Sequence, residues 1–203
     1  MSVEITVDDK ASTVIAALID ACGKAGRVHL HQVAANALAN LIQRHVAYYA
    51  ARKHTTAREL GAQITGHYEK GSAAITSHGD FESGTVVIPI PGIQRAWHDL
   101  NITAKKGALT IPVHQMSYGR RVLEMEALGW KVWSPKKKDG ATMSGVLMGR
   151  RDGEVAALYI LKKSVHQPKD PTLLPSNEEL GKTAAESAVR EVMRIIRKAR
   201  SAA

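Results

Sequence analysis

The stretch Gly107-Ala-Leu-Thr-Ile-Pro-Val-His-Gln-Met-Ser-Tyr-Gly-Arg-Arg121 lies where the pattern of the chain changes. Much of the sequence before it has the apolar spacing of helices, and most of the sequence after it, up to about residue 165, favours strands. Within the stretch, Leu109 to Val113 is a short apolar run. Pro112 has no amide hydrogen to give to a neighbouring strand, so this run is expected at a sheet edge or ends at the proline. The stretch therefore marks a junction between a helical half and a sheet half.

Apolar stripes predict helices before the junction. The strongest stripe runs from about Leu30 to Ala51 and repeats every three or four residues for about four turns. Its members are Leu30, Val33, Ala34, Ala37, Leu38, Leu41, Ile42, His45 and Val46. Weaker patterns predict a helix from residue 12 or 13 to 24, interrupted by Gly23 and Gly26, and another from residue 55 or 56 to 69. The opposite face of the long helix carries the uncharged amides Gln32, Asn36, Asn40 and Gln43, which fits either a face covered by a partner or a solvated face.

Alternating patterns predict a series of short strands. They cover residues 3–7, 73–77, 85–90, 102–104, 109–113, 130–133, 145–148 and 154–161. We expect 102–104 to pair with 109–113 across the turn between them. Asp152-Gly153 predicts a hairpin between the last two strands, with Val155, Ala157, Tyr159 and Leu161 on one side. The loop before that hairpin, which holds Lys136, Lys137 and Lys138, is expected to be a mobile tip.

The segment from Val165 to Pro175 contains three prolines and is expected to be an extended arm with no helix or strand ladder of its own. A plain surface linker is the alternative interpretation. Ser176-Asn-Glu-Glu179 is a capping box and predicts a final helix to about Arg200. The apolar stripe of that helix is Leu180, Ala184, Ala188, Val192, Ile195, Ile196 and Ala199.

These elements together predict an α+β fold. N-terminal helices pack on a small, mostly antiparallel sheet, followed by the proline-rich arm and the C-terminal helix. We expect a core domain over residues 1–164 and an arm with its helix over residues 165–203.

Composition limits the classes of function. The net charge is +9, from 28 basic and 19 acidic residues, which attracts polyanions and acidic protein surfaces or simply keeps the surface solvated. The basic residues form small groups along the chain rather than one block. The longest weakly polar run, Thr85 to Ile93, is too short to span a membrane, and the first ten residues do not resemble a signal peptide. A single cysteine, Cys22, fits a reducing compartment.

No pattern in the sequence indicates catalysis. His29 and His31 point to different faces of a helix, and no cysteine or carboxylate stands at ligand spacing, so neither a metal nor another cofactor is predicted. Cys22 is interpreted as a small core residue rather than a nucleophile. The chain has no phosphate-binding glycine loop and no nucleophile elbow. We therefore predict that the protein is not an enzyme, with a small hydrolase whose site is unrecognised as a remaining alternative.

A series of short motifs does indicate a family. Gly92-Ile-Gln-Arg-Ala-Trp-His98 is followed by Leu109-Thr-Ile-Pro-Val113 and Ser117-Tyr-Gly-Arg-Arg121, and later by Tyr159-Ile-Leu-Lys-Lys-Ser-Val-His-Gln-Pro168 and Asp170-Pro-Thr-Leu-Leu-Pro175. From about residue 30 onward, this order resembles the neck or tail-completion proteins of tailed bacteriophages, which belong to the virion-morphogenesis group. Relatives often carry Arg-Pro-Phe-Leu before the last helix, where this chain has Asp170 to Pro175.

The resemblance implies a non-enzymatic subunit of a homo-oligomeric ring between the portal complex of the phage head and the tail. It implies as partners the connector or head-completion proteins, the tail proteins and genomic DNA in the lumen, with assembly in the host cytoplasm and a final place in the virion. A basic nucleic-acid-binding module is the alternative function. The residues expected at interfaces are Arg120, Arg121, Lys136, Lys137, Lys138, Pro168, Asp170, Pro171, Leu173, Leu174 and Pro175.

Overall fold

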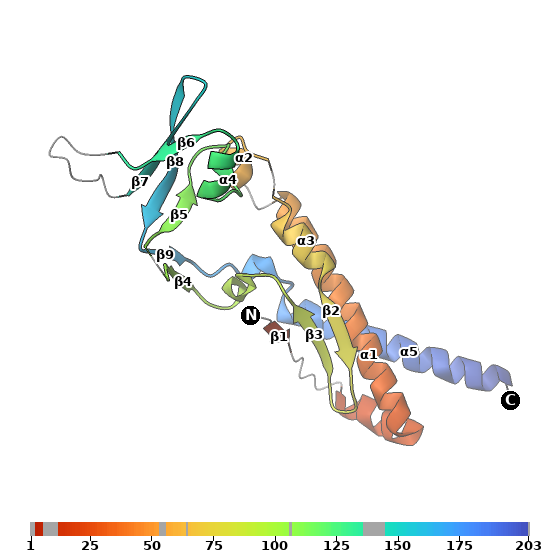
Figure 1. Cartoon of the computed structure of the whole chain (residues 1–203). Helices are drawn as coiled ribbons and strands as arrows, with labels where there is room; N and C mark the ends of the chain where they lie inside the picture. Colours follow the sequence, from red (N-terminus) through yellow and green to blue (C-terminus); the bar gives the residue numbers. More distant parts are fainter. Residues whose placement is uncertain are drawn as a thin grey trace. The chain divides into compact units, whose positions relative to one another are not determined.

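The computed structural model describes the backbone of residues 3–5, 12–52, 56–63, 65–105, 107–135 and 145–202, and the side chains of those between 23 and 197. Helices and short antiparallel sheets make up the chain, which confirms the α+β class. The contacts divide it into two compact units (Figure 1). Unit 1 comprises Met1–Ala51, His67–His98 and Lys169–Ala203, and unit 2 comprises Arg52–Gly66 and Asp99–Pro168. This division differs from the expected one at residue 164, because residues 169–203 belong to the same unit as the long N-terminal helix.

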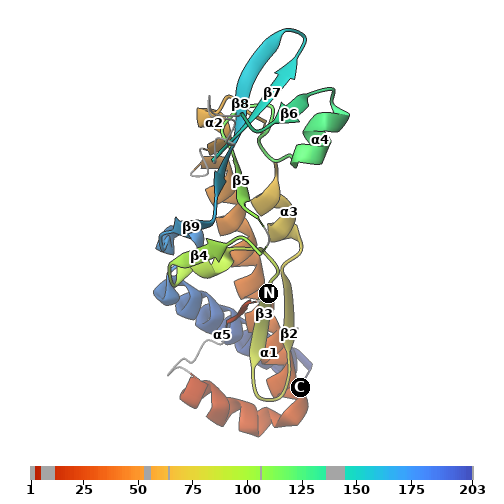
Figure 2. The ribbon, with the colours of Figure 1, turned by 60° about the vertical axis from the view of Figure 1, so that its left-hand side comes forward.

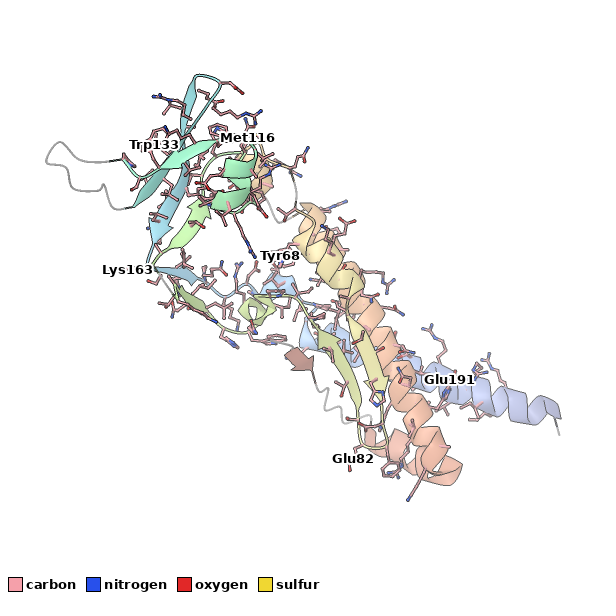
Figure 3. All side chains as sticks on the ribbon, in the orientation of Figure 1. Tyr68, Glu82, Met116, Trp133, Lys163 and Glu191 are labelled. Atoms are coloured by element: carbon pink, nitrogen blue, oxygen red, sulfur yellow. The ribbon has the colours of Figure 1, made fainter. Side chains whose placement is uncertain are left out.

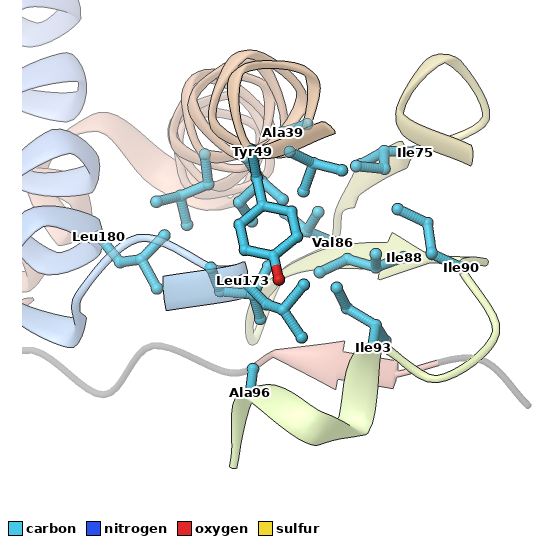
Figure 4. Close-up of a cluster of buried hydrophobic side chains, with 14 of the residues drawn as sticks. Ala39, Tyr49, Ile75, Val86, Ile88, Ile90, Ile93, Ala96, Leu173 and Leu180 are labelled. Atoms are coloured by element: carbon cyan, nitrogen blue, oxygen red, sulfur yellow. The ribbon is translucent and has the colours of Figure 1, made fainter. Parts of the chain in front are cut away.

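Unit 1 is built on the helix α1, Ser12–Arg52. The helix is broken at Gly23, whose φ of 77° and ψ of 176° are not helical, whereas it continues through Gly26. A three-stranded antiparallel sheet packs on it in the order β1 (Val3–Ile5), β3 (Gly84–Ile88) and β2 (Thr76–Gly79). The core between them contains Leu38, Ile42, Val46, Tyr49, Ile75, Val86, Ile88 and Ile90 (Figure 4).

Two short 3₁₀ turns and the last helix close this core. They are η1 (Ile93–Ala96), η2 (Pro171–Leu173) and α5 (Asn177–Ala202). The core receives Ile93 from η1, Leu173 and Leu174 from η2 and the residue after it, and Leu180 from α5. The core of unit 1 thus joins segments that lie far apart in the sequence.

The predicted helix over residues 55–69 is wrong, because the chain forms two short helices there. These are α2 (Thr56–Glu59) and α3 (His67–Ala73). Gly61 and Gly66 lie between them with φ of 64° and 68°, a left-handed backbone that only glycine adopts freely. The two glycines therefore end the helical pattern that the apolar residues suggested.

Part of the uncharged amide face of α1 contacts β2 and the residue before it. The Gln32 side-chain oxygen accepts a hydrogen bond of 2.8 Å from the Gly79 amide, and the Gln43 amide donates to the Ile75 carbonyl at 3.2 Å. The Ser77 hydroxyl also donates to Asn36 at 2.7 Å. Contacts within the chain thus explain Gln32 and Gln43, which satisfy backbone groups at a sheet edge, whereas Asn36 and Asn40 are exposed.

Unit 2 contains a four-stranded antiparallel sheet in the order β5-β8-β7-β6 and a two-stranded sheet of β4 and β9 (Figure 2). The strands are β4 (Leu100–Thr103), β5 (Leu109–Pro112), β6 (Lys131–Trp133), β7 (Val146–Arg151), β8 (Glu154–Lys162) and β9 (Ser164–Gln167). The edge position predicted from Pro112 is confirmed. The predicted pairing of 102–104 with 109–113 is wrong, because β4 pairs with β9 and β5 with β8.

The hairpin between β7 and β8 turns at Asp152 and Gly153, as predicted, with φ of 51° and 85°. A bulge interrupts it, since Leu147 pairs with Tyr159 and Met148 with Ala157, so that Leu158 is the additional residue. The bulge brings both Leu158 and Tyr159 into the core with Met125 and Trp130. The expectation that Val155 and Ala157 share a side with Tyr159 is therefore wrong. The helix α4 (Val122–Ala127), which was not predicted, supplies Met125.

The segment over residues 165–175 is not the unpaired arm that was expected. Its first residues belong to β9, and Leu173, Leu174 and Pro175 are buried. The prolines are compatible with this structure, since Pro168 follows the strand and Pro171 is the first residue of η2, where an amide hydrogen is not needed. No helix in the described part of the chain is long and apolar enough to cross a membrane.

Candidate functional site

The expected interface residues do not form one surface. Arg120 and Arg121 are exposed in unit 2, and Lys136, Lys137 and Lys138 lie outside the described residues. Pro168 and Pro171 are exposed and Asp170 is partly buried, whereas Leu173, Leu174 and Pro175 are buried in unit 1. The last three are unavailable to a partner, and the prediction that they contact one is wrong, because hydrophobic burial within their own chain already covers them.

Asp170 anchors the segment around η2 to the rest of unit 1. Its carboxylate accepts hydrogen bonds from the Thr172 amide at 3.0 Å, the Thr172 hydroxyl at 2.6 Å and the Tyr49 hydroxyl at 2.7 Å. Its own amide donates to the Arg95 carbonyl at 2.7 Å. His45, the one polar member of the predicted stripe on α1, donates to the Thr172 carbonyl at 2.9 Å. These bonds give Asp170 a structural role inside the unit.

The ionisation of this pair follows from its contacts. Burial raises the pKa of Asp170, but the hydrogen bonds from Thr172 and Tyr49 and the charge of Arg95 outweigh it and hold the pKa below its ordinary value. Burial and the neighbouring carboxylate together raise the pKa of Tyr49. Asp170 therefore stays ionised and Tyr49 stays neutral over the physiological pH range.

The motif Ser117 to Arg121 is an anchor of the same kind in unit 2. The fully buried Ser117 hydroxyl lies 2.6 Å from the Leu158 carbonyl and 2.8 Å from the His114 carbonyl. The Tyr159 hydroxyl donates to the Arg120 carbonyl at 3.0 Å. The motif therefore holds the turn before α4 against the bulge in β8, and its serine has no exposed surface on which to act chemically.

Part of the surface of α5 is apolar and exposed. Ser176 caps the helix by accepting from the Glu179 amide at 3.2 Å, as predicted, and Leu180 and Ala188 are buried in unit 1. Beyond this point three apolar side chains are exposed: Val189 is 50% exposed, Met193 51% and Ile196 37%. We call these three residues the distal α5 face. Val189 and Met193 lie outside the predicted stripe, so α5 has two apolar faces and only one of them serves its own core.

Glu191 joins α5 to α1 beside the distal α5 face (Figure 3). Its carboxylate accepts a hydrogen bond of 2.6 Å from the His29 ring and is held by Arg194 through two bonds of 2.7 and 2.6 Å. The bonds from Arg194 and His29 lower the pKa of Glu191 to about 2. The arrangement fixes the spacing of the two helices at this level.

An open groove of about 660 Å³ runs between the two helices. It is lined by Val33, Asn36, Ala37, Asn40, Ser187, Arg190, Glu191, Met193, Arg194 and Arg197. Arg190 and Arg197 make no hydrogen bond or ion pair with any residue that the structure describes. Because Met193 belongs to both, the basic groove and the distal α5 face form one continuous surface. Such a surface suits a protein segment with an apolar stripe and carboxylates beside it.

The groove was not predicted from the sequence. The signal that could have revealed it is that Val189 and Met193 lie outside the main stripe and, with Ile196, repeat at intervals of four and three residues. Among the residues with described side chains, no three His, Cys, Asp or Glu side chains are grouped to hold a metal. Comparisons with family models, with curated proteins and with solved structures find no match.

Proposed function

We propose that this chain is a structural protein of a tailed-phage particle, a neck or tail-completion subunit that associates with copies of itself and joins the head to the tail. The distal α5 face is the observation that carries the association. Fully burying a Val, Ile or Met side chain contributes roughly 1.5–3 kcal/mol. Three such side chains side by side on one helix therefore favour contact with another protein.

The resemblance to phage proteins supports the more specific part of the proposal. The motifs that carry it include Ser117, Tyr159 and Asp170, each of which makes a hydrogen bond that holds its unit together. The resemblance thus rests on residues that this fold requires, and a relative that keeps them has reason to share the fold. A ring subunit needs surfaces for neighbours, which the groove and the distal α5 face offer.

The test uses particles assembled without this protein. Heads and tails are expected to accumulate unjoined, or tails to have faulty ends, and adding back the wild-type chain should restore joining. Met193→Glu should fail to restore it, whereas Met193→Leu, which keeps the apolar surface, should succeed. Normal infectious particles in the absence of the protein would end the proposal.

A second candidate function, binding of nucleic acid, is favoured by the distribution of charge. Unit 2 contains 15 of the 28 basic residues and only 7 of the 19 acidic ones, a net charge of +8, whereas unit 1 has 13 and 12, a net charge of +1. Affinity for DNA should then fall by about one log unit per log unit of salt for each phosphate contacted. Weak binding that salt does not change would contradict this function.

A further inference from the structure

The four-stranded sheet of unit 2 has an outer face that its own core does not use. Side chains alternate between the two faces of a strand, so the register assigns each one. Three rows cross this face: Ile111, Ile160 and Val146; Trp133, Met148 and Ala157; and Lys131, Arg150 and Val155, with Leu109 and Lys162 at one end. We call these residues the outer sheet face. It has an apolar centre, with Lys131 and Arg150 toward one end and Lys162 toward the other.

The outer sheet face lacks a cover among the described elements. None of its residues belongs to the hydrophobic core clusters, whereas the opposite face supplies Leu147, Ala156, Leu158 and Tyr159 to one. Ile160 is 37% exposed and Val155 48% exposed, and Lys131, Arg150 and Lys162 are all exposed. In the apolar centre, Ile111, Val146, Trp133 and Met148 are partly exposed. An apolar centre that is partly exposed and has no described cover is typical of a protein contact.

The other side of the same unit presents the complementary chemistry. There α4 packs on the inner face of the sheet through Met125 and Val122. Its outward side carries Leu123, which is 76% exposed, together with Glu126 and Glu124. The Glu124 carboxylate also accepts a hydrogen bond of 2.7 Å from the Arg121 amide, which caps the first turn of the helix. An exposed leucine flanked by two carboxylates is thus displayed on a short, well-anchored helix.

We propose that α4 of one copy of the chain docks on the outer sheet face of a second copy. Leu123 enters the apolar centre near Met148 and Ile160, and Glu124 and Glu126 meet the basic residues of the face. The outer sheet face and α4 lie on opposite sides of one sheet. Each copy can therefore bind one neighbour through α4 and a second neighbour through its outer sheet face. This head-to-tail contact produces a closed ring if the rotation closes, and a filament if it does not. The proposal rests on the self-association proposed above and names a second surface for it, besides the distal α5 face.

A second copy fits this face better than nucleic acid does. DNA is bound chiefly through its phosphates, which need a continuous row of cations rather than an apolar centre. Here two apolar rows separate the Lys131 and Arg150 end from Lys162. The carboxylates of α4 supply opposite charge and Leu123 supplies apolar surface in one small element.

The test measures self-association of the full-length chain by sedimentation velocity over a range of protein and salt concentrations. Leu123→Glu should weaken association by about tenfold or more without unfolding, because Leu123 lies outside the core. Arg150→Glu and Glu126→Arg should each weaken it by on the order of tenfold, and the double variant should recover it. Lys70→Glu, the same charge change on α3 in unit 1, is the matched control and should leave association unchanged.

A zero-length carbodiimide cross-link identifies which residues of the two copies meet. In a mixture of ¹⁴N- and ¹⁵N-labelled chains, Glu126 should be joined to Lys131, the neighbour of Arg150 in the same row, in peptides of mixed label. Wild-type chains that remain monomeric, or single variants that associate as the wild type does, would overturn the proposal. An Arg150→Glu variant that loses DNA affinity but keeps self-association would overturn it in favour of nucleic acid. Particles that join normally without the protein would refute the phage role while leaving this contact to be judged by association alone.

Discussion

The Tyr49 hydroxyl donates a hydrogen bond of 2.7 Å to the Asp170 carboxylate, across 121 positions of sequence. The bond joins α1 to the segment that begins η2, and it lies beside the buried Leu173. A hydrogen bond to a charged group contributes about 1.5–3 kcal/mol. Tyr49→Phe should therefore lower the free energy of unfolding of unit 1 by about this amount, measured by urea denaturation. Tyr118→Phe removes a hydroxyl with no hydrogen-bond partner among the described residues and should change little.

The same carboxylate predicts a dependence on pH. Because the pKa of Asp170 is lower in the folded protein than in the unfolded chain, its ionised form stabilises the fold above the unfolded value of about 3.9. That contribution is lost as the pH falls through the lower folded pKa. Asp170→Asn should flatten the loss of stability below about pH 4. An unchanged acid profile in this variant would show that Asp170 is not the group responsible.

Substitution of two glycines, Gly79 and Gly181, distinguishes a close backbone contact from the low helix propensity of glycine. A Cβ at Gly79 would lie 2.2 Å from the Gln32 amide nitrogen, so Gly79→Ala must push β2 away from α1. We expect a loss of about 1–3 kcal/mol or more in thermal or chemical unfolding. A Cβ at Gly181, inside α5, would meet nothing within 4 Å. Gly181→Ala should instead stabilise the protein by about 0.5–1 kcal/mol, and equal effects at both positions would contradict the packing described.

Ser117 is a test of the anchor in unit 2. Removing its hydroxyl in Ser117→Ala leaves the Leu158 carbonyl at the bulge without its 2.6 Å hydrogen bond. That carbonyl still accepts from the Val113 amide at 3.0 Å, so the variant loses a hydrogen bond without leaving the carbonyl unpaired, which costs about 0.5–1.5 kcal/mol. Unit 2 should therefore unfold at lower urea concentration. Ser117→Cys keeps a weak donor of similar size and should lose less. If both variants unfold as the wild type does, the serine does not hold the turn.

The contact between Glu191 and His29 should control the motion of the end of α5. In Glu191→Gln the charge that Arg194 and His29 share is removed, so α5 should separate from α1 more often at this level. Amide hydrogen exchange over residues 191–197 should become faster, while exchange near Leu180 remains slow. Lys182→Gln, which removes an exposed charge that pairs with Glu186 within the helix, should leave the exchange rates near Glu191 unchanged.

Local sequence patterns predicted helix breaks, turns and caps better than they predicted which strands pair. The break at Gly23, the hairpin at Asp152-Gly153 and the Ser176 cap depend on a few neighbouring residues, and the structure confirms all three. The pairing of β4 with β9 and of β5 with β8 depends on residues between 47 and 67 positions apart, for which a single sequence gives no local signal. The bulge at Leu158 likewise follows from packing, since the core takes two consecutive residues of one strand.

The candidate surfaces were harder to predict for a related reason. Leu173 and Leu174 look exposed in a proline-rich segment, but burial in unit 1 depends on α1 lying beside them. Val189 and Met193 look like members of an ordinary amphipathic helix, but they belong neither to the buried core of unit 1 nor to the residues packed against it. Which apolar side chains stay exposed depends on how the rest of the chain folds.

The interleaved order of the two units has a consequence for synthesis on the ribosome. All strands and helices of unit 2 are available once residue 168 has emerged, so that unit can close while the last segment is still being made. Unit 1 must wait for Leu173, Leu174 and Leu180, and until then the apolar stripe of α1 has no complete cover. A pause in translation shortly after residue 168 would prolong the exposure of that stripe. A chaperone that binds nascent chains would then find the largest exposed apolar surface.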